Sequence, residues 1–331
     1  MNTEKNNDEK IVKEYSENIV FLQLVGPQNC NIDKIERELN VTIQTIGNKV
    51  VVIGKSDATK AVVSILDSLY DRAKKGLHIE NADIDAAIRM NFGGKVVASA
   101  TERKTDDLTI KTRKRHISPR TATQAEYIKA MLDNELVFGL GPAGTGKTYL
   151  AVALAVSMMI EGKVDRIILS RPAVEAGEHL GFLPGDLKEK VDPYLRPLYD
   201  ALYDMMPSDQ VDKKLESGEI EIAPLAFMRG RTLANSVVIL DEAQNTTPMQ
   251  MKMFLTRLGE NSRMVINGDL SQTDLPGGTI SGMSDSLEIL EKISGIAVVN
   301  FTEKDVVRHG LVAKIVKAYD DRFKAKQKAK S

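Results

Sequence analysis

The chain has 331 residues, of which 42% are hydrophobic and 27% charged, and its formal net charge is −1. This composition is that of a folded globular protein long enough for one large and one small domain, and it excludes a protein that is basic over its whole surface. The single cysteine, Cys30, excludes a disulfide within the chain.

The sequence predicts neither export nor insertion into a membrane. Residues 1–10 are polar and charged where a signal peptide needs an apolar core. The longest apolar run, 150–160, is too short to span a bilayer. We therefore expect a cytoplasmic protein with no membrane partner.

The first third of the chain predicts a polar leader at 1–18 and then a small α+β domain at 19–95. The expected elements are a strand at 19–25, a helix at 32–39, strands at 41–46 and 49–53 joined by a Gly47-Asn48 turn, and a helix at 57–75. Their order is β-α-β-β-α. A unit of this size can fold by itself.

Two basic segments flank the larger domain. The connector at 96–120 carries seven lysines and arginines between Arg103 and Arg120, against only Asp106 and Asp107. Such a segment is either simply solvated or follows a phosphate backbone, and the sequence leaves both open. The lysine-rich segment at 321–331 is expected to be a solubilising tail.

Strand-like and helical runs alternate from residue 121 to residue 320. The strand-like runs lie at 136–140, 166–170, 219–223, 237–241, 264–267 and 297–301. This alternation predicts an α/β domain whose parallel sheet is covered by helices on both faces. Ligands of such sheets bind at the carboxyl ends of the strands.

A glycine-rich loop follows the first of these strands and precedes a helix. It reads Gly141-Pro142-Ala143-Gly144-Thr145-Gly146-Lys147-Thr148, and we count Tyr149 with it as a nucleotide-binding residue. The glycines allow a tight turn whose N–H groups cradle phosphate oxygens, and the helix adds its positive N-terminal end. Lys147 is expected to reach the β- and γ-phosphates and Thr148 to ligate Mg²⁺. A chance glycine-rich turn is disfavoured by the strand before it and the helix after it.

Two later strands end in acids and amides. Asp241 suits the Mg²⁺ shell and Glu242 suits polarisation of the attacking water. Asp269 and Gln272 follow the next strand, where they could sense the γ-phosphate, although Gly-Asp is also a common turn. Together with the loop at 141–148, these residues favour hydrolysis over binding alone.

These motifs resemble two related groups of proteins. The motifs at 241–244 and 268–272, with Gln124 upstream, resemble the motor core of superfamily 1 helicases, where that glutamine contacts adenine and so favours ATP. The closer resemblance is to the PhoH family, carried by residues 138–148, 170–174, 181–185, 228–231, 240–245, 268–276 and 305–309. It implies a RecA-like P-loop NTPase domain over about 117–320 that uses ATP and Mg²⁺ in RNA metabolism or ribosome maturation.

Three functions are compatible with these motifs. The leading hypothesis is an ATPase that acts on RNA or ribonucleoprotein, and whether it unwinds RNA as a helicase does stays open. The alternative is a nucleotide-gated binding module that hydrolyses slowly and docks a processing enzyme onto ribosomal precursor RNA. A metabolic kinase is disfavoured, because the motifs at 241–244 and 268–272 look like motor features.

The N-terminal domain resembles a KH domain, in which a Gly-x-x-Gly loop clamps the nucleic-acid backbone. The corresponding loop is Gly26-Pro27-Gln28-Asn29, in which Asn29 replaces the second glycine. Asparagine tolerates left-handed backbone better than most residues, although it allows a less close approach than glycine. RNA contact and protein docking are both open for this domain.

Phosphoryl transfer of this type usually requires an arginine finger. The residues after Asp269 are too few for a second sheet domain, so the arginine must come from this domain or from a neighbouring subunit. A head-to-tail homo-oligomeric ring follows as a hypothesis. Arg308, after the last predicted strand, is the preferred finger, whereas Arg171 is expected to face nucleic acid.

Overall fold

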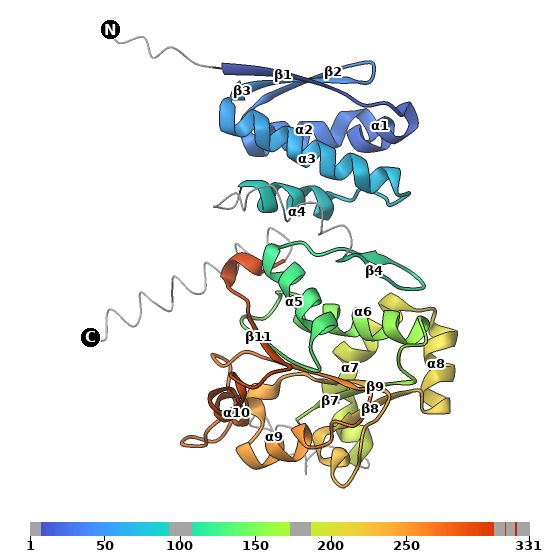
Figure 1. Cartoon of the computed structure of the whole chain (residues 1–331), viewed down its shortest axis with the longest axis vertical. Helices are drawn as coiled ribbons and strands as arrows, with labels where there is room; N and C mark the ends of the chain where they lie inside the picture. The colour runs from blue at the N-terminus through green and yellow to red at the C-terminus, as the bar shows by residue number, and fades with distance from the viewer. Residues whose placement is uncertain (1–7, 93–107, 173–186, 308–314, 316–321, 323–331) are drawn as a thin grey trace, which may run out of the picture. The chain divides into compact units, whose positions relative to one another are not determined.

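The computed structural model describes residues 8–92, 108–172 and 187–307, together with 315 and 322 (Figure 1). The chain divides into two compact units. One comprises Met1–Thr109 and Ser118–Ala125, and the other comprises Ile110–Ile117 and Glu126–Ser331. Part of the predicted connector therefore belongs to the second unit. Of the predicted tail, only Arg322 lies within the described residues.

The first unit combines a three-stranded antiparallel sheet with helices. Its elements are β1 (Asp8–Glu14), α1 (Asn18–Val25), η1 (Pro27–Asn29), α2 (Cys30–Leu39), β2 (Thr42–Ile46), β3 (Lys49–Lys55), α3 (Ser56–Lys74) and α4 (Asn81–Phe92). The strand order is β1-β3-β2. Leu24, Ile35, Val52 and Ile65 meet in its core, which confirms the predicted α+β character and the predicted elements from residue 32 to residue 75.

The predicted strand at 19–25 is wrong, because these residues form helix α1. The helix buries Phe21 and Leu24 but leaves Ile19 77% exposed. A short apolar run does not distinguish a strand from a helix by its period. The third strand of the sheet is β1 instead, which lies within the predicted polar leader and pairs Ile11 with Val52.

The second unit contains a six-stranded parallel sheet. Its elements are β4 (Ile110–Lys111), β5 (His116–Ile117), α5 (Ala122–Asp133, which begins in the first unit), β6 (Leu136–Leu140), α6 (Lys147–Ile160), β7 (Arg166–Arg171), α7 (Leu187–Met205), α8 (Ser208–Ser217), β8 (Ile220–Pro224), η5 (Leu225–Met228), β9 (Ser236–Leu240), η6 (Ala243–Asn245), α9 (Pro248–Leu255), β10 (Arg263–Gly268), α10 (Gly282–Leu290), β11 (Ile296–Asn300) and η7 (Glu303–Asp305). The strand order is β11-β6-β10-β9-β7-β8, and every neighbouring pair is parallel. All six predicted strands are confirmed.

Helices cover both faces of this sheet (Figure 1). Phe138, Ile168 and Leu240 point into one core, which Phe254 of α9 and Met283 of α10 complete. On the other face α6 contacts β7, β9 and β10, and α7 contacts β7 and β8. Because helices cover both faces, the carboxyl edge of the sheet is where the loops are free to carry polar side chains.

No helix in the described part of the chain is both long enough and apolar enough to cross a membrane.

Candidate nucleotide site at the carboxyl edge of the sheet

The glycine-rich loop, which follows β6, is held by the ends of the two strands that flank β6 in the sheet. Gly141 donates its N–H to the carbonyl of Gly268 on β10 (3.1 Å), and Phe301, after β11, donates to the carbonyl of Leu140 (2.7 Å). Gly141 has a φ of 131°, and a Cβ at this position would lie 2.3 Å from the Phe301 carbonyl oxygen. Only glycine fits there, so the loop begins with its backbone pressed against the neighbouring chain segment.

Lys147 turns its ammonium group back into this loop. The Nζ atom donates to the carbonyls of Gly141 (2.7 Å) and Pro142 (2.9 Å) and to Thr145 Oγ1 (3.2 Å). It also lies 5.9 Å from the ring centroid of Phe301. Burial lowers the pKa of Lys147, and the nearby carboxylates oppose this by raising it. The loop therefore concentrates a buried positive charge, as a site for phosphate oxygens requires.

Thr148 and Asp241 meet although 92 residues separate them in the chain. The Thr148 hydroxyl donates to Asp241 Oδ1 at 2.6 Å. Asp241 directly follows β9, is 4% exposed, and donates its own N–H to the Ser170 carbonyl (2.9 Å). A hydroxyl beside a carboxylate is a set of hard oxygen donors, which suits Mg²⁺. The structure thus brings together the two residues predicted to hold that ion.

Gln244 connects the two acidic strand ends. Its Nε2 donates to Glu242 Oε2 (2.7 Å) and to the carbonyl of Gln272 (3.2 Å), and its Oε1 accepts from the N–H of Asp269 (3.1 Å). Gln244 belongs to the motif at 241–244, and the sequence alone indicates no role for it. Its 1% exposure and three partners show that it fixes the relative position of these residues.

Asp269 keeps one oxygen turned away from all described protein donors. Its Oδ1 accepts from the N–H (3.0 Å) and hydroxyl (2.6 Å) of Ser271. Its Oδ2 is buried without a hydrogen-bond partner among the described residues. Buried carboxylate oxygens are normally paired, so Asp269 also fits a site that receives a polar ligand.

Of three other predicted residues, two are described by the structure and one is not. Gln124 is 4% exposed, belongs to the first unit, and accepts the N–H of Arg120 (2.6 Å), so its adenine contact stays a prediction. Tyr149 donates its hydroxyl to Asp204 Oδ2 (2.7 Å). Arg308 lies outside the described residues. Val307, the last residue described before it, donates its N–H to the Gly144 carbonyl (2.9 Å).

Arg171, which the sequence analysis expects to face nucleic acid, is directed at Asp241. Its Nε donates to Asp241 Oδ2 at 2.9 Å, and Nη2 contacts the same oxygen. Its Nη1 donates to the carbonyl of Tyr194 in α7 at 2.9 Å. The sequence could not indicate this pairing, because it joins the ends of two strands that are far apart in the chain.

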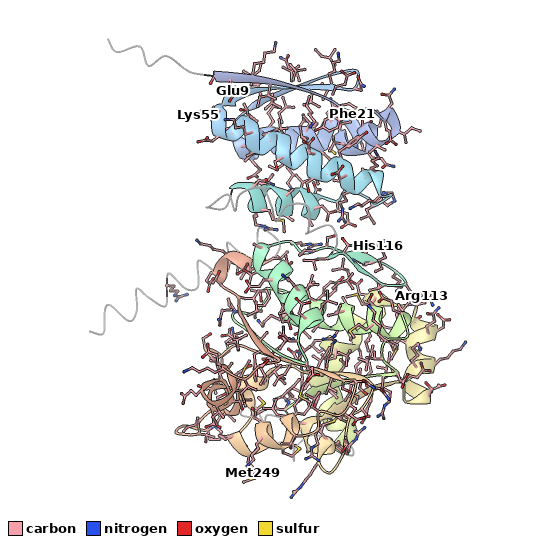
Figure 2. The ribbon with its side chains drawn as sticks, in the orientation of Figure 1. Glu9, Phe21, Lys55, Arg113, His116 and Met249 are labelled. Carbon is pink, nitrogen blue, oxygen red and sulfur yellow. The ribbon has the colours of Figure 1, made fainter. Side chains whose placement is uncertain are left out.

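The connector is partly folded onto the second unit. Lys114 donates to the Tyr203 carbonyl (2.8 Å), and Arg115 pairs with Asp204 (2.8 Å). Both residues, like Arg113 and His116 (Figure 2), lie on the segment that forms β4 and β5. Lys114 and Arg115 are thus engaged within the unit. Connector residues 96–107 lie outside the described residues.

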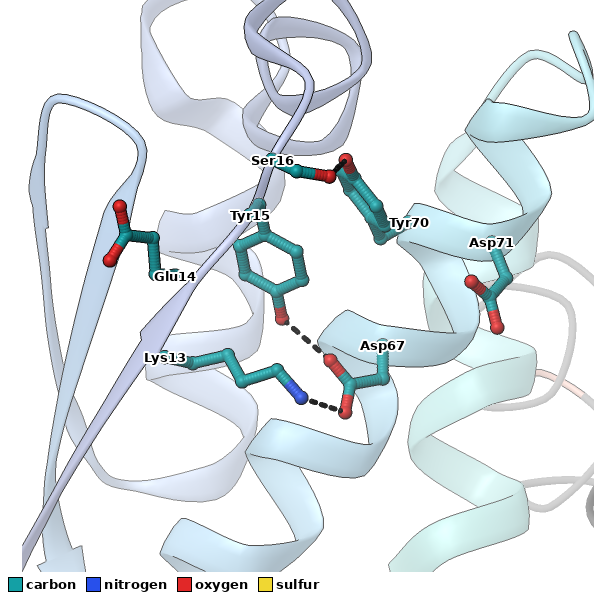
Figure 3. A pocket seen from close by; sticks show the side chains of 7 residues that line it. All are labelled: Lys13, Glu14, Tyr15, Ser16, Asp67, Tyr70 and Asp71. Atoms are coloured by element: carbon teal, nitrogen blue, oxygen red, sulfur yellow. Dashed lines mark hydrogen bonds and ion pairs between the residues drawn. The ribbon is translucent and has the colours of Figure 1, made fainter.

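A separate cavity of about 360 Å³ lies in the first unit (Figure 3). It is lined by Lys13, Glu14, Tyr15, Ser16, Asp67, Tyr70 and Asp71. Asp67 accepts hydrogen bonds from Lys13 (2.8 Å) and Tyr15 (3.1 Å), and burial followed by the charge of Asp67 raises the pKa of Tyr15. With more acids than bases in its wall, this cavity does not suit a phosphate group.

Residues 116–320 match the family model of PhoH-like proteins. The chain belongs to the PhoH-like protein family. The PhoH-like protein of Bacillus subtilis (strain 168) is 51% identical over 299 residues, which cover 90% of this chain and 93% of that protein. The PhoH-like protein of Mycobacterium tuberculosis (strain ATCC 25618 / H37Rv) is 47% identical over 299 residues, covering 89% and 84%. Protein PhoH of Escherichia coli (strain K12) is 49% identical over 205 residues, which cover 61% of this chain and 58% of that protein.

The family match and the strand order together define a P-loop nucleotide-binding fold. The match covers the glycine-rich loop and all six strands of the parallel sheet. Residues 1–109, which make up most of the first unit of this PhoH-like protein, lie outside that match, yet the Bacillus and Mycobacterium relatives align with most of the whole chain. The likeness to these relatives is therefore not confined to the nucleotide-binding part.

Proposed function

We propose that this PhoH-like protein binds ATP with Mg²⁺, hydrolyses it, and couples its nucleotide state to an RNA or ribonucleoprotein target. One observation carries the first part: the Thr148 hydroxyl and the Asp241 carboxylate meet at 2.6 Å beside the loop that buries Lys147. Glu242 directly follows Asp241 and is exposed at the same strand end. This is an arrangement for hydrolysis, because binding alone does not need a second carboxylate there.

In this proposal the loop N–H groups and Lys147 would hold the β- and γ-phosphates, and Thr148 and Asp241 would hold Mg²⁺. The ion would supply positive charge against the charge that develops on the phosphate oxygens. Glu242 accepts a proton from a water molecule while the oxygen of that water bonds to the γ-phosphorus, and the bond from phosphorus to the ADP oxygen breaks. Gln244 keeps Glu242 and the Gln272 loop in register through its bonds to both.

The RNA part of the proposal is supported by the first unit. The loop compared with Gly-x-x-Gly joins α1 to α2, and Gln28 and Asn29 take φ values of 53° and 64°. Both are exposed. Two successive residues with left-handed backbone form an exposed turn, in which the Asn29 N–H donates to the Gly26 carbonyl (3.2 Å). Asn29 thus takes the left-handed backbone that the second glycine of a Gly-x-x-Gly loop would allow.

ATP turnover with and without single-stranded RNA tests this proposal, with Lys147→Ala as the control for the site. RNA-stimulated hydrolysis that is lost in Lys147→Ala is the expected result. Nucleotide binding with slow hydrolysis that RNA does not accelerate would favour the binding module that docks a processing enzyme on precursor RNA. Absence of nucleotide binding would refute both.

The head-to-tail ring is proposed as the oligomeric form, because a neighbouring subunit is one source of the finger arginine. Molar mass in solution, measured with and without ATP, tests it. A protein that is monomeric in both conditions and still hydrolyses ATP would refute the ring without affecting the proposed chemistry.

A further inference from the structure

We propose that Arg171 is a counter-ion that competes with Mg²⁺ for Asp241 and that its release from Asp241 is transmitted to helix α7 through Tyr194. Arg171 is therefore a positioning residue of the nucleotide site. This inference rests on the proposed function, because it requires a nucleotide-bound Mg²⁺ at Asp241.

Protein groups already engage both carboxylate oxygens of Asp241. Thr148 occupies Oδ1, and the Nε and Nη2 atoms of Arg171 converge on Oδ2. The side chains of Arg171 and Asp241 are 16% and 6% exposed, so water screens the pair poorly. A guanidinium that presents two N–H groups to one oxygen of a buried carboxylate makes a strong, directional contact.

Full contact of both Arg171 and a divalent ion with this carboxylate is unfavourable in free energy. Two cations on one buried carboxylate repel each other in an environment of low dielectric constant. Either Mg²⁺ binds more weakly while Arg171 stays, or Arg171 leaves Oδ2 when Mg²⁺ arrives.

The third contact of the guanidinium gives this movement a route to α7. Nη1 donates to the Tyr194 carbonyl, so the same rigid plane joins Asp241 to the helix. Farther along, α7 is held by the connector, where Lys114 and Arg115 bond to Tyr203 and Asp204. A shift of Arg171 would therefore act on the part of α7 near Tyr194 and leave its last turn fixed.

Mg²⁺ titrations of nucleotide binding test the competition. Fluorescently labelled ADP is bound at a series of Mg²⁺ concentrations by the wild type, Arg171→Gln, Arg171→Lys and the control Arg263→Gln. Arg263 is a half-buried arginine at the start of β10 that donates to the Met131 (3.3 Å) and Asn134 (2.7 Å) carbonyls. Coupling between sites is typically 5- to 150-fold, so Arg171→Gln should lower the half-saturating Mg²⁺ concentration at least about fivefold. Arg171→Lys, which keeps the charge, should change it less, and Arg263→Gln should leave it unchanged.

A tryptophan introduced by Tyr194→Trp tests the link to α7. The chain contains no tryptophan, so this probe is unique, and the substitution keeps the backbone carbonyl that accepts from Arg171. Adding Mg²⁺ with ADP should change the tryptophan emission when Arg171 is present. It should not change the emission with Arg171→Gln or Arg171→Lys, because neither side chain can bond to Asp241 and to the carbonyl of residue 194 at the same time. Hydrogen exchange of the α7 amides in the chain with native Tyr194 gives the same comparison without the probe.

The possible results separate this inference from the proposed function. If the wild type binds ADP but Arg171→Gln leaves the half-saturating Mg²⁺ concentration within about twofold, the competition is refuted. If α7 responds equally with and without Arg171, the transmission is refuted. If Arg171→Gln fails to fold, Arg171→Lys still tests the link, and an unchanged α7 response in it refutes the inference. A wild type that binds no nucleotide refutes both the inference and the proposed function.

Discussion

The phosphate loop of this PhoH-like protein depends on a close contact that a single methyl group would destroy. In Gly141→Ala the new Cβ would lie 2.3 Å from the Phe301 carbonyl oxygen and 2.9 Å from its carbonyl carbon. A non-glycine residue at a φ of 131° costs about 1–3 kcal/mol in backbone strain. Displacing packed backbone costs about another 1–3 kcal/mol. We therefore expect the free energy of unfolding to fall by about 2–6 kcal/mol.

Gly162→Ala is the matched control in the same unit. Gly162 has a φ of 68°, but nothing lies within 4 Å of a Cβ built there, so only the left-handed backbone costs about 1–2 kcal/mol. Urea unfolding of both variants separates the clash from the conformational strain, and labelled-ADP binding reports on the loop. Equal destabilisation by the two substitutions, or unchanged ADP affinity in Gly141→Ala, would refute the argument that Phe301 shapes the loop.

Three further outcomes follow from the contacts at the strand ends. Glu242→Gln should reduce ATP turnover by about 10²–10⁴ with ADP affinity retained, and equal losses of both would contradict its role as the base. Gln244→Leu should lower the free energy of unfolding, measured in urea, by about 1–3 kcal/mol per unsatisfied buried group, and it should slow ATP turnover. A free energy of unfolding equal to that of the wild type would show that the three hydrogen bonds of Gln244 do not stabilise the protein. Arg308→Ala should reduce turnover by about 10³ or more while sparing binding. In the proposed ring, mixing it with Lys147→Ala subunits should restore part of the activity, because each variant supplies what the other lacks, and no recovery in the mixture would place the finger in the same chain.

The larger unit was predictable because its signals are local. Strands buried on both faces are continuous apolar runs, and β6, β9 and β10 all have this character. The spacing of the motif residues identifies the glycine-rich loop, and the length of the apolar run after it identifies the helix. The strand order, with β11 next to β6, came only from the structure.

The first unit was predicted less well, for two physical reasons. Helix α1 has only eight residues, too few to establish a 3.6-residue period against a strand. Strand β1 alternates charged and apolar residues only weakly, because its side chains are exposed or half-buried along its whole length. Neither feature leaves a pattern that a sequence alone resolves.

Within the site, the sequence indicated which residues matter but not how they pair. Lys147, Thr148, Asp241 and Asp269 were found because each sits at a motif position. Arg171 bonding to Asp241 could not be found, since it depends on β7 and β9 being neighbours and on the rotamer of a long side chain.

The contacts after β11 bear on where the finger arginine comes from. Phe301 closes the loop at Gly141 and lies beside Lys147, and Val307 then bonds to the Gly144 carbonyl. Each subunit thus builds this wall of its own phosphate site from the residues that follow β11. The mixture of Arg308→Ala with Lys147→Ala subunits decides whether the finger arginine comes from the same subunit, because only a finger supplied by a neighbour can restore activity there.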